Sequence, residues 1–113
     1  MATLTQAELR NRILEHLGVK AAGQSASAED SGLVDEALES SHSILRKFGL
    51  CPFALTAIPD WAQPGLRDYV AADVSPAFGK AVDVIATKAV AERELSRQLA
   101  RHKSELRTMP DYY

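Results

Sequence analysis

Apolar residues recur at helical spacing near the start of the chain, and the residues beside them mark the ends of a helix. Thr5 and Glu8 have the spacing of a capping box, in which each side chain accepts a hydrogen bond from the other residue's backbone N–H. Gly18 can adopt the left-handed conformation that closes a helix. The pattern therefore predicts a helix over about 6–17. Its apolar positions are Leu9, Ile13, Leu14 and Leu17.

A second helical pattern follows a loop of small and polar residues at 19–27. Ser27 is a suitable N-cap, because its hydroxyl can accept a hydrogen bond from a free backbone N–H of the first turn. Gly49 ends the pattern, so we expect a helix over about 28–48. Its apolar positions are Val34, Ala37, Leu38, Ile44, Leu45 and Phe48.

Residues 50–63 interrupt the helical pattern with two prolines, a tryptophan and several apolar residues. We expect an ordered crossover loop that Phe53, Ile58 and Trp61 pin to the core. Pro64 suits the first turn of a third helix, where its missing N–H costs nothing. The apolar positions of this third helix are Leu66, Tyr69, Val70, Ala72 and Val74.

The last helical pattern is the longest, and its character changes halfway. Ser75 and Pro76 have the types favoured at an N-cap and first helical position, which predicts a helix from Pro76 to about Ser104. A broad apolar face in its first half, expected in the core, consists of Phe78, Val82, Ile85, Ala86 and Ala89. From Glu92 onward the apolar stripe is narrow, so we expect this half to project or to contact a neighbouring subunit. The stripe consists of Leu95, Leu99 and Leu106.

Together these patterns predict an all-α protein, a small bundle of about four helices with a long C-terminal helix and an extended C-terminal tail. We expect a helical domain at 1–107 and a docking tail at 108–113. The length of 113 residues suits one domain, and 46% hydrophobic with 25% charged residues is typical of globular chains. Residues 1–12 lack the pattern of a signal peptide, and no apolar stretch approaches the ~20 residues of a membrane span. No contact with a membrane is expected.

Charge is unevenly distributed along a chain whose net charge is only −2. The second helix carries the acidic residues Asp35, Glu36 and Glu39, whereas the last helix carries the basic residues Arg93, Arg97 and Arg101. Complementary charges of this kind could join copies of the chain head to side, so these six residues are candidate subunit contacts. The alternative interpretation is two solvated helix faces.

No candidate catalytic or metal site has the residues that its chemistry requires. Glu39 and His42 form one E-x-x-H pair, but helical bundle metal sites need two such pairs and further carboxylates. Cys51 precedes Pro52 in an apolar stretch and is more typical of a packed thiol than of a nucleophile. The chain also lacks a glycine-rich phosphate loop. We therefore expect no catalytic residues, no metal, no cofactor and no enzymatic activity.

A small helical DNA-binding or regulatory module is the alternative function for such a chain. A recognition helix needs a basic, exposed start, because it approaches the phosphate backbone. The second helix instead begins with acidic residues, and the third offers only Arg67. These features disfavour sequence-specific DNA recognition.

The C-terminal segment is the most suggestive candidate for a partner contact. It is too short to fold alone, and its two tyrosines and proline are apolar enough to anchor in another protein, since tyrosine is favoured at interfaces. A frayed end is the alternative interpretation. The residues concerned are Met109, Pro110, Asp111, Tyr112 and Tyr113.

The order of these elements and two junction motifs resemble a known family. A capped first helix ending at Leu17-Gly18 and a second ending at Phe48-Gly49-Leu50 precede the sequence A-I-P-D-W at 57–61. A third helix, the sequence S-P-A-F-G at 75–79 and a long closing helix follow. Over nearly its whole length the chain resembles the head-to-tail adaptor proteins (head-completion or connector proteins) of tailed bacteriophages, including the tail accessory factor of short-tailed phages.

The resemblance implies a structural virion protein at the head–tail junction, assembled in the host cytoplasm. Such adaptors form homo-oligomeric rings, commonly dodecameric, beneath the portal protein. The ring extends the channel for genomic DNA without reading its sequence, helps to retain the packaged DNA and provides the attachment point for a downstream tail or nozzle protein. By this resemblance Met109 to Tyr113 dock on the portal, and the helices at 28–48 and 76–104 form the ring.

Overall fold

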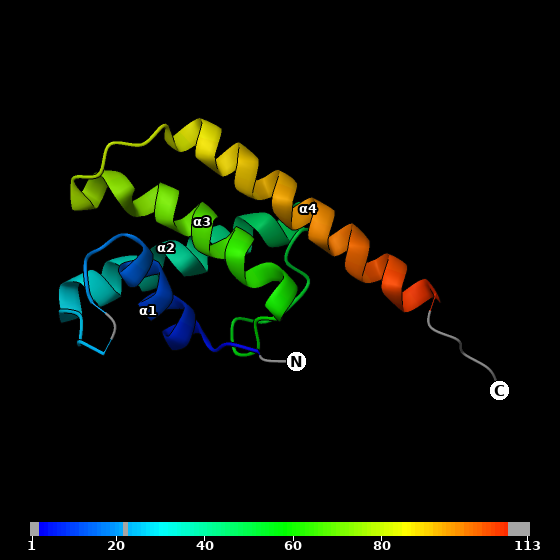
Figure 1. Ribbon diagram of the computed structural model, residues 1–113, viewed down its shortest axis with the longest axis horizontal. Helices are drawn as coiled ribbons and strands as arrows, with labels where there is room; N and C mark the ends of the chain where they lie inside the picture. Colours follow the sequence, from blue (N-terminus) through cyan, green and yellow to red (C-terminus); the bar gives the residue numbers. More distant parts are fainter. Residues whose placement is uncertain (1–2, 22, 109–113) are drawn as a thin grey trace.

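The computed structural model describes residues 3–21 and 23–108, with the backbone alone for 106–108, and within this part the protein is all-α. Four α-helices and two short 3₁₀ turns follow one another along the chain (Figure 1). They are α1 (Gln6–His16), α2 (Ala28–Lys47), η1 (Asp60–Ala62), α3 (Gln63–Val74), η2 (Ser75–Phe78) and α4 (Val84–Thr108). The predicted fold class of a small helical bundle with a long C-terminal helix is confirmed. The predicted tail lies largely outside the described residues.

The ends of α1 and α2 follow from local hydrogen bonds that the sequence encodes. At α1, the Glu8 backbone N–H donates to Thr5 Oγ1 over 3.3 Å, and the Thr5 N–H donates to Glu8 Oε1 over 3.0 Å. The hydrogen bond from the Thr5 backbone, helped by the Thr5 hydroxyl, lowers the pKa of Glu8. At α2, the Asp30 N–H donates to Ser27 Oγ over 3.1 Å. The predicted capping box and the Ser27 cap are thus confirmed.

Helix α3 lies at the centre of the bundle, with α4 packed along one side and α1 and α2 on the other (Figure 1). Its five predicted core residues are all buried. Gly65 lets α4 approach closely, because a Cβ atom there would lie only 2.7 Å from Leu95 Cγ. The core joins residues of all four helices, among them Leu9, Leu38, Leu66 and Leu95.

The crossover loop between α2 and α3 closes one end of the bundle. The Leu4 N–H donates to the Ile58 carbonyl over 3.0 Å and the Ile58 N–H donates back over 2.8 Å, which ties the loop to the chain before α1. Ile58 and Cys51 are fully buried, and Phe53 and Trp61 are partly buried against the core. The predicted pinning of this loop is therefore confirmed.

The predicted start of the last helix at Pro76 is wrong. Residues Ser75–Phe78 form the turn η2, and Gly79 at φ +72° takes the left-handed conformation that ends it. The chain then runs without regular structure until the Asp83 carboxylate accepts a hydrogen bond of 3.1 Å from the Ala86 N–H. Helix α4 therefore begins at Val84, capped by Asp83, because the left-handed Gly79 ends the turn that contains Pro76.

The prediction of which half of α4 is buried is also wrong. Ile85 is 83% exposed, although the sequence pattern predicts a core position for it, and the neighbouring Val90 is 59% exposed. Leu95 and Leu99 of the narrow stripe are instead buried. The reason lies in α3, whose Gly65 receives Leu95 and so fixes which segment of α4 is packed.

Polar contacts also join the first half of α4 to α3. Lys88 Nζ lies 2.8 Å from Asp73 Oδ1 and 4.8 Å from the centroid of the Tyr69 ring. Partial burial alone would lower the pKa of Lys88, but the hydrogen bond and charge of Asp73, with Tyr69, outweigh it and raise that pKa. The Lys88 ammonium, shared by the Asp73 carboxylate and the Tyr69 ring, holds this part of α4 on α3. The opposite side of α4 stays exposed.

Candidate assembly surfaces

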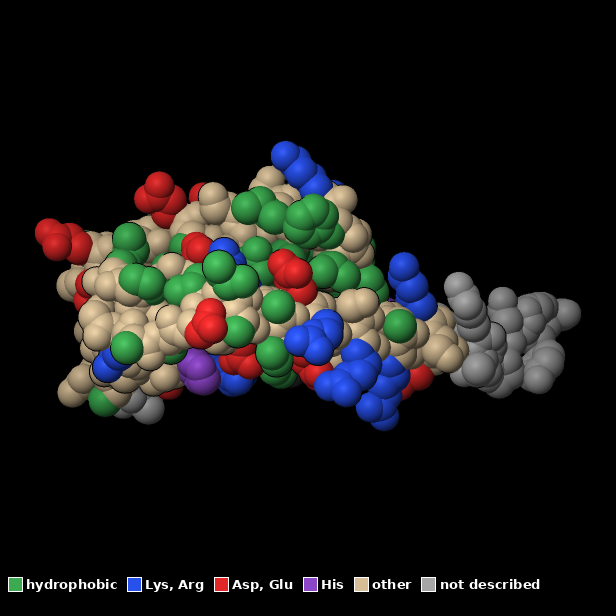
Figure 2. Space-filling view, turned by 90° about the horizontal axis from the view of Figure 1, so that it is seen from above, with side chains coloured by type: hydrophobic (Ala, Val, Ile, Leu, Met, Phe, Trp, Pro, Cys, Tyr) green, Lys and Arg blue, Asp and Glu red, His purple; other side chains and the backbone are tan. Residues whose placement is uncertain are grey.

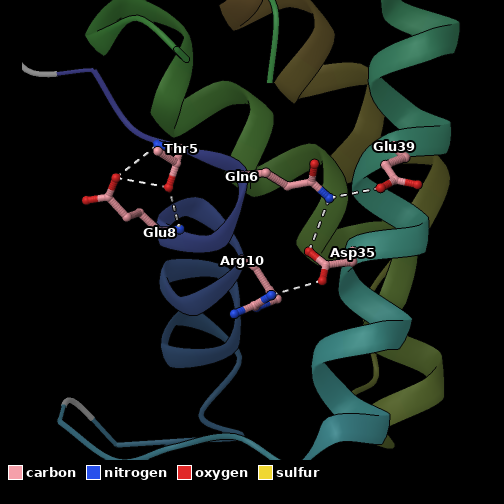
Figure 3. A network of polar contacts seen from close by, with 6 residues as sticks. All are labelled: Thr5, Gln6, Glu8, Arg10, Asp35 and Glu39. Carbon is pink, nitrogen blue, oxygen red and sulfur yellow. Dashed lines mark hydrogen bonds and ion pairs between the residues drawn. The ribbon is translucent and has the colours of Figure 1, made fainter. Parts of the chain in front are cut away.

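The acidic residues predicted as subunit contacts lie on α2, but two of them face α1 (Figure 3). Asp35 Oδ2 accepts a hydrogen bond from Arg10 Nη1 over 2.9 Å, and Gln6 Nε2 donates to Asp35 Oδ1 over 3.2 Å. The same Gln6 amide group donates to Glu39 Oε1 over 3.1 Å. Asp35 and Glu39 therefore help to join α1 to α2, whereas Glu36 is exposed.

The seam between α1 and α2 is polar and only partly shielded. The side chains of Arg10 and Asp35 are 24% and 30% exposed, so their ion pair is expected to contribute up to about 1 kcal/mol. Arg10 Nε is buried and has no hydrogen-bond partner among the described residues, which offsets part of that gain. The seam thus orients α2 on α1 more than it stabilises the fold.

The basic residues predicted as subunit contacts share one exposed side of α4. Arg93, Arg97 and Arg101 are spaced four residues apart, which places them on one face of the helix. Arg97 pairs with Glu94, and Arg101 Nε lies 3.5 Å from Glu105 Oε1. Hydrogen bonds from Arg97 and then from Gln98 lower the pKa of Glu94. The Arg97 and Arg101 side chains nevertheless remain 76% and 72% exposed.

The structure does not bring the acidic and basic residues together, because α2 and α4 lie on opposite sides of α3. Seen from the side of α4, Lys and Arg side chains gather over its second half (Figure 2). Within one copy of the chain, the charges of Glu36 and Arg93 are thus too far apart in the fold to pair. Both are exposed and open to a partner.

Two exposed apolar surfaces accompany these charges, and the sequence pattern did not reveal either. The first, which we call the apolar face of α4, consists of Ile85 and Val90 of α4 with Val82 just before the helix, which are 83%, 59% and 45% exposed. Figure 2 shows hydrophobic side chains over this part of the molecule. The second, the outer stripe of α2, consists of Leu33, Ile44 and Phe48, which are 38%, 45% and 65% exposed. The sequence pattern places Ile44 and Phe48 among the apolar helical positions and predicts the core for Val82 and Ile85, but it includes neither Leu33 nor Val90.

An open groove of about 810 Å³ lies beside the apolar face of α4. Its lining comes from the end of α1, from α3, from the segment after η2 and from α4. Small and apolar lining residues include Leu17, Ala71, Val82, Val90 and Ala91. Charged residues such as Arg67, Asp68 and Glu94 also line it. A groove of apolar and charged residues next to exposed apolar side chains is suited to packing against another protein.

The candidate residues for catalysis or metal binding form hydrogen bonds within the fold or are buried in its core. His42 Nε2 lies 2.6 Å from the Phe53 carbonyl oxygen, so its ring is engaged with the crossover loop, while Glu39 turns to α1. In the described part of the chain no three His, Cys, Asp or Glu side chains gather as a metal site would need. Cys51 is fully buried, and burial raises the pKa of its thiol to about 12. This thiol is a packed core group.

The predicted portal-docking residues, Met109, Pro110, Asp111, Tyr112 and Tyr113, lie outside the described residues. Among the described helices none has the length and apolar composition needed to cross a bilayer. Comparison with protein-family models, curated proteins and solved structures finds no match to this chain.

Proposed function

We propose that the protein is a structural subunit, a head-to-tail adaptor of a tailed bacteriophage that assembles as a ring under the portal. The observation that carries this proposal is the apolar face of α4, where Val82 and Val90 are exposed along an open groove and Ile85 is 83% exposed. Exposed apolar side chains along a groove are costly in water and are typical of a surface that contacts another protein. A chain that works by contact needs such a surface more than it needs a reactive site.

A ring also requires a second, different surface, and the outer stripe of α2 meets that need. It lies across α3 from the apolar face of α4, so one copy can present each surface to a different neighbour. Contacts between two unlike surfaces repeat head to tail, and they close into a ring when the rotation between subunits allows it. Glu36 beside one surface and Arg93 beside the other supply opposite charges.

The net charge of the chain agrees with a channel that lets DNA pass without binding it tightly. Proteins that bind nucleic acid tightly carry a strongly basic surface, because phosphate neutralisation dominates their affinity. Here the net charge is −2, and Arg97 and Arg101 pair with Glu94 and Glu105. In this proposal genomic DNA passes through the ring without sequence recognition.

The proposal is tested by mixing the purified protein with a portal ring encoded in the same genome and counting bound copies by native mass spectrometry. We expect a closed ring of adaptor subunits on the portal. A variant ending at residue 107 tests the tail, with the full chain as its control. Equal binding by the two forms would remove the docking role of Met109 to Tyr113, while no binding by either would overturn the adaptor function.

A further inference from the structure

Three aromatic rings meet beside the crossover loop, at the end of the molecule away from the apolar face of α4. The Phe53 and Trp61 rings lie edge to face at 85°, with centroids 5.7 Å apart. The His102 ring of α4 stacks on Trp61 at 22°, with centroids 5.5 Å apart. All three side chains are only partly buried, so ring surface remains open to a ligand.

These rings form the walls of a hollow of about 290 Å³. Two prolines, Pro52 and Pro59, extend the walls, and the carboxylate residue Asp60 belongs to the lining together with Thr3 and Ala57. Most of the lining is therefore apolar and aromatic, with one acidic group. This composition is typical of ligand pockets, in which a few polar groups in an apolar cavity set the specificity.

Hydrogen bonds hold the hollow in shape without a ligand. The contact of His42 Nε2 with the Phe53 carbonyl, 2.6 Å long, fixes the start of the loop. The paired hydrogen bonds between Leu4 and Ile58 fix its end, and Asp60 and Trp61 then lie together in the 3₁₀ turn η1. A preformed pocket binds more tightly than one that must be ordered, because less entropy is lost on binding.

Asp60 supplies a carboxylate that forms no ion pair with the described residues. A second hollow on the other side of Trp61 also includes Asp60, with Arg101 and Glu105. There Arg101 Nε is directed to Glu105 Oε1 at 3.5 Å, which leaves the Asp60 carboxylate available. The faces of Phe and Trp rings carry negative electrostatic potential, so Phe53, Trp61 and the Asp60 carboxylate favour the same kind of ligand, a cation.

We propose that this aromatic pocket, formed by Phe53, Trp61 and His102 with Asp60, binds an arginine side chain of a partner protein. A guanidinium is planar, stacks on aromatic surfaces and donates two parallel hydrogen bonds to a carboxylate. A lysine ammonium is more strongly hydrated and cannot stack in this way, so arginine fits the pocket better. The inference does not depend on the adaptor function, since it concerns a different surface.

Trp61 is the only tryptophan of the chain, so its fluorescence reports directly on the pocket. Capped Gly-Arg-Gly is titrated at neutral pH into the millimolar range, beside the same peptide with citrulline, a neutral isostere, or with lysine. We expect saturable changes in Trp61 emission with the arginine peptide, and affinity lower by about tenfold with citrulline, since its hydrogen bonds to the carboxylate carry no charge. Lysine is expected to fall between the two.

Variants identify the side chains that bind the arginine peptide. Asp60→Asn is expected to lower the affinity for the arginine peptide by about tenfold, which is the loss expected when a hydrogen-bond partner loses its charge. Glu29→Gln removes an exposed carboxylate elsewhere and is expected to leave binding unchanged. Phe53→Leu keeps apolar volume but removes a ring, so it should also weaken binding. Circular dichroism of each variant reports whether it is folded.

Two results would overturn the proposal. Equal affinity for the citrulline and arginine peptides means that the pocket recognises apolar shape and not charge. A flat titration with every peptide, in a wild-type protein that circular dichroism shows to be folded, means that the pocket binds no such side chain. Neither result bears on ring assembly, which is measured separately.

Discussion

Gly65 lies where α4 packs on α3, and there is no room for a side chain at this position. A Cβ atom there would lie 2.7 Å from Leu95 Cγ and 2.9 Å from Leu95 Cδ2, and Leu95 is fully buried. We expect Gly65→Ala to lower the free energy of unfolding by about 1–3 kcal/mol, because an overpacked core must shift side chains or backbone. Urea denaturation measures the change.

Gly32 provides the matched control, since it is also a helical glycine. A Cβ atom there would meet nothing within 4 Å. Gly32→Ala is expected to raise the free energy of unfolding by about 0.5–1 kcal/mol, because alanine loses less backbone entropy on folding. Stabilisation by the alanine at both positions would show that α3 and α4 do not pack as described.

The Cys51 thiol reports on the integrity of the core. It is fully buried, and burial raises the pKa of the thiol from 9.0 to about 12. Because only the thiolate reacts with iodoacetamide, we expect negligible labelling of the native protein at mildly alkaline pH and rapid labelling in denaturant. Mass spectrometry of the adduct measures both. Equal rates in the two conditions would place Cys51 at the surface.

The same raised pKa has a consequence for stability at high pH. The folded state favours the neutral thiol, so its contribution is complete below the ordinary pKa of 9.0 and is lost as the pH rises towards about 12. We therefore expect the melting temperature to fall over this alkaline range. Cys51→Ala, which has no thiol to ionise, should show a smaller fall, and an identical fall in both would assign it to other groups.

At the scale of elements, the sequence was sufficient wherever the signal was local. Thr5, Ser27 and Gly49 mark their helix ends through contacts a few residues away, and the structure confirms α1 and α2 there. The start of α4 was not predictable from Pro76, because proline suits a 3₁₀ turn as well as a helix start. The left-handed Gly79 and the cap at Asp83 decide the outcome.

The choice of the buried half of α4 is a tertiary effect and yields a direct test. Leu95→Ala is expected to cost about 2–5 kcal/mol of unfolding free energy, because it opens a cavity against α3. Ile85→Ala, at a side chain 83% exposed, should change it by no more than about 0.5 kcal/mol. Urea denaturation compares the two variants, and a larger cost at Ile85 would mean that the first half of α4 is the core.

At the scale of the whole molecule, the candidate contacts were only partly visible in the sequence. The exposed side of Arg93, Arg97 and Arg101 could be predicted, because helical spacing alone places them on one face. The engagement of Asp35 with Arg10 could not, since these residues are far apart along the chain and meet only when α1 packs on α2. The apolar face of α4 was missed because a hydrophobic period does not tell an outer surface from a core.

Glu36 and Arg93 allow the proposed head-to-tail contact to be tested by charge exchange. Both are exposed, on opposite sides of α3, so replacing them should leave the fold intact. In a ring of unlike surfaces, Glu36→Arg alone or Arg93→Glu alone places like charges at every interface. Each repulsion costs on the order of 1 kcal/mol, repeated around the ring. We expect each single variant to assemble poorly on the portal ring.

The double variant carrying both changes restores opposite charges at every interface, because the same contact repeats between all neighbours. We therefore expect it to assemble like the wild-type protein, and mass photometry of the complexes measures this. High salt should reduce the defect of the single variants, since exposed charges are screened. If the double variant is as defective as the two single variants, Glu36 and Arg93 do not face each other and the proposed contact is wrong.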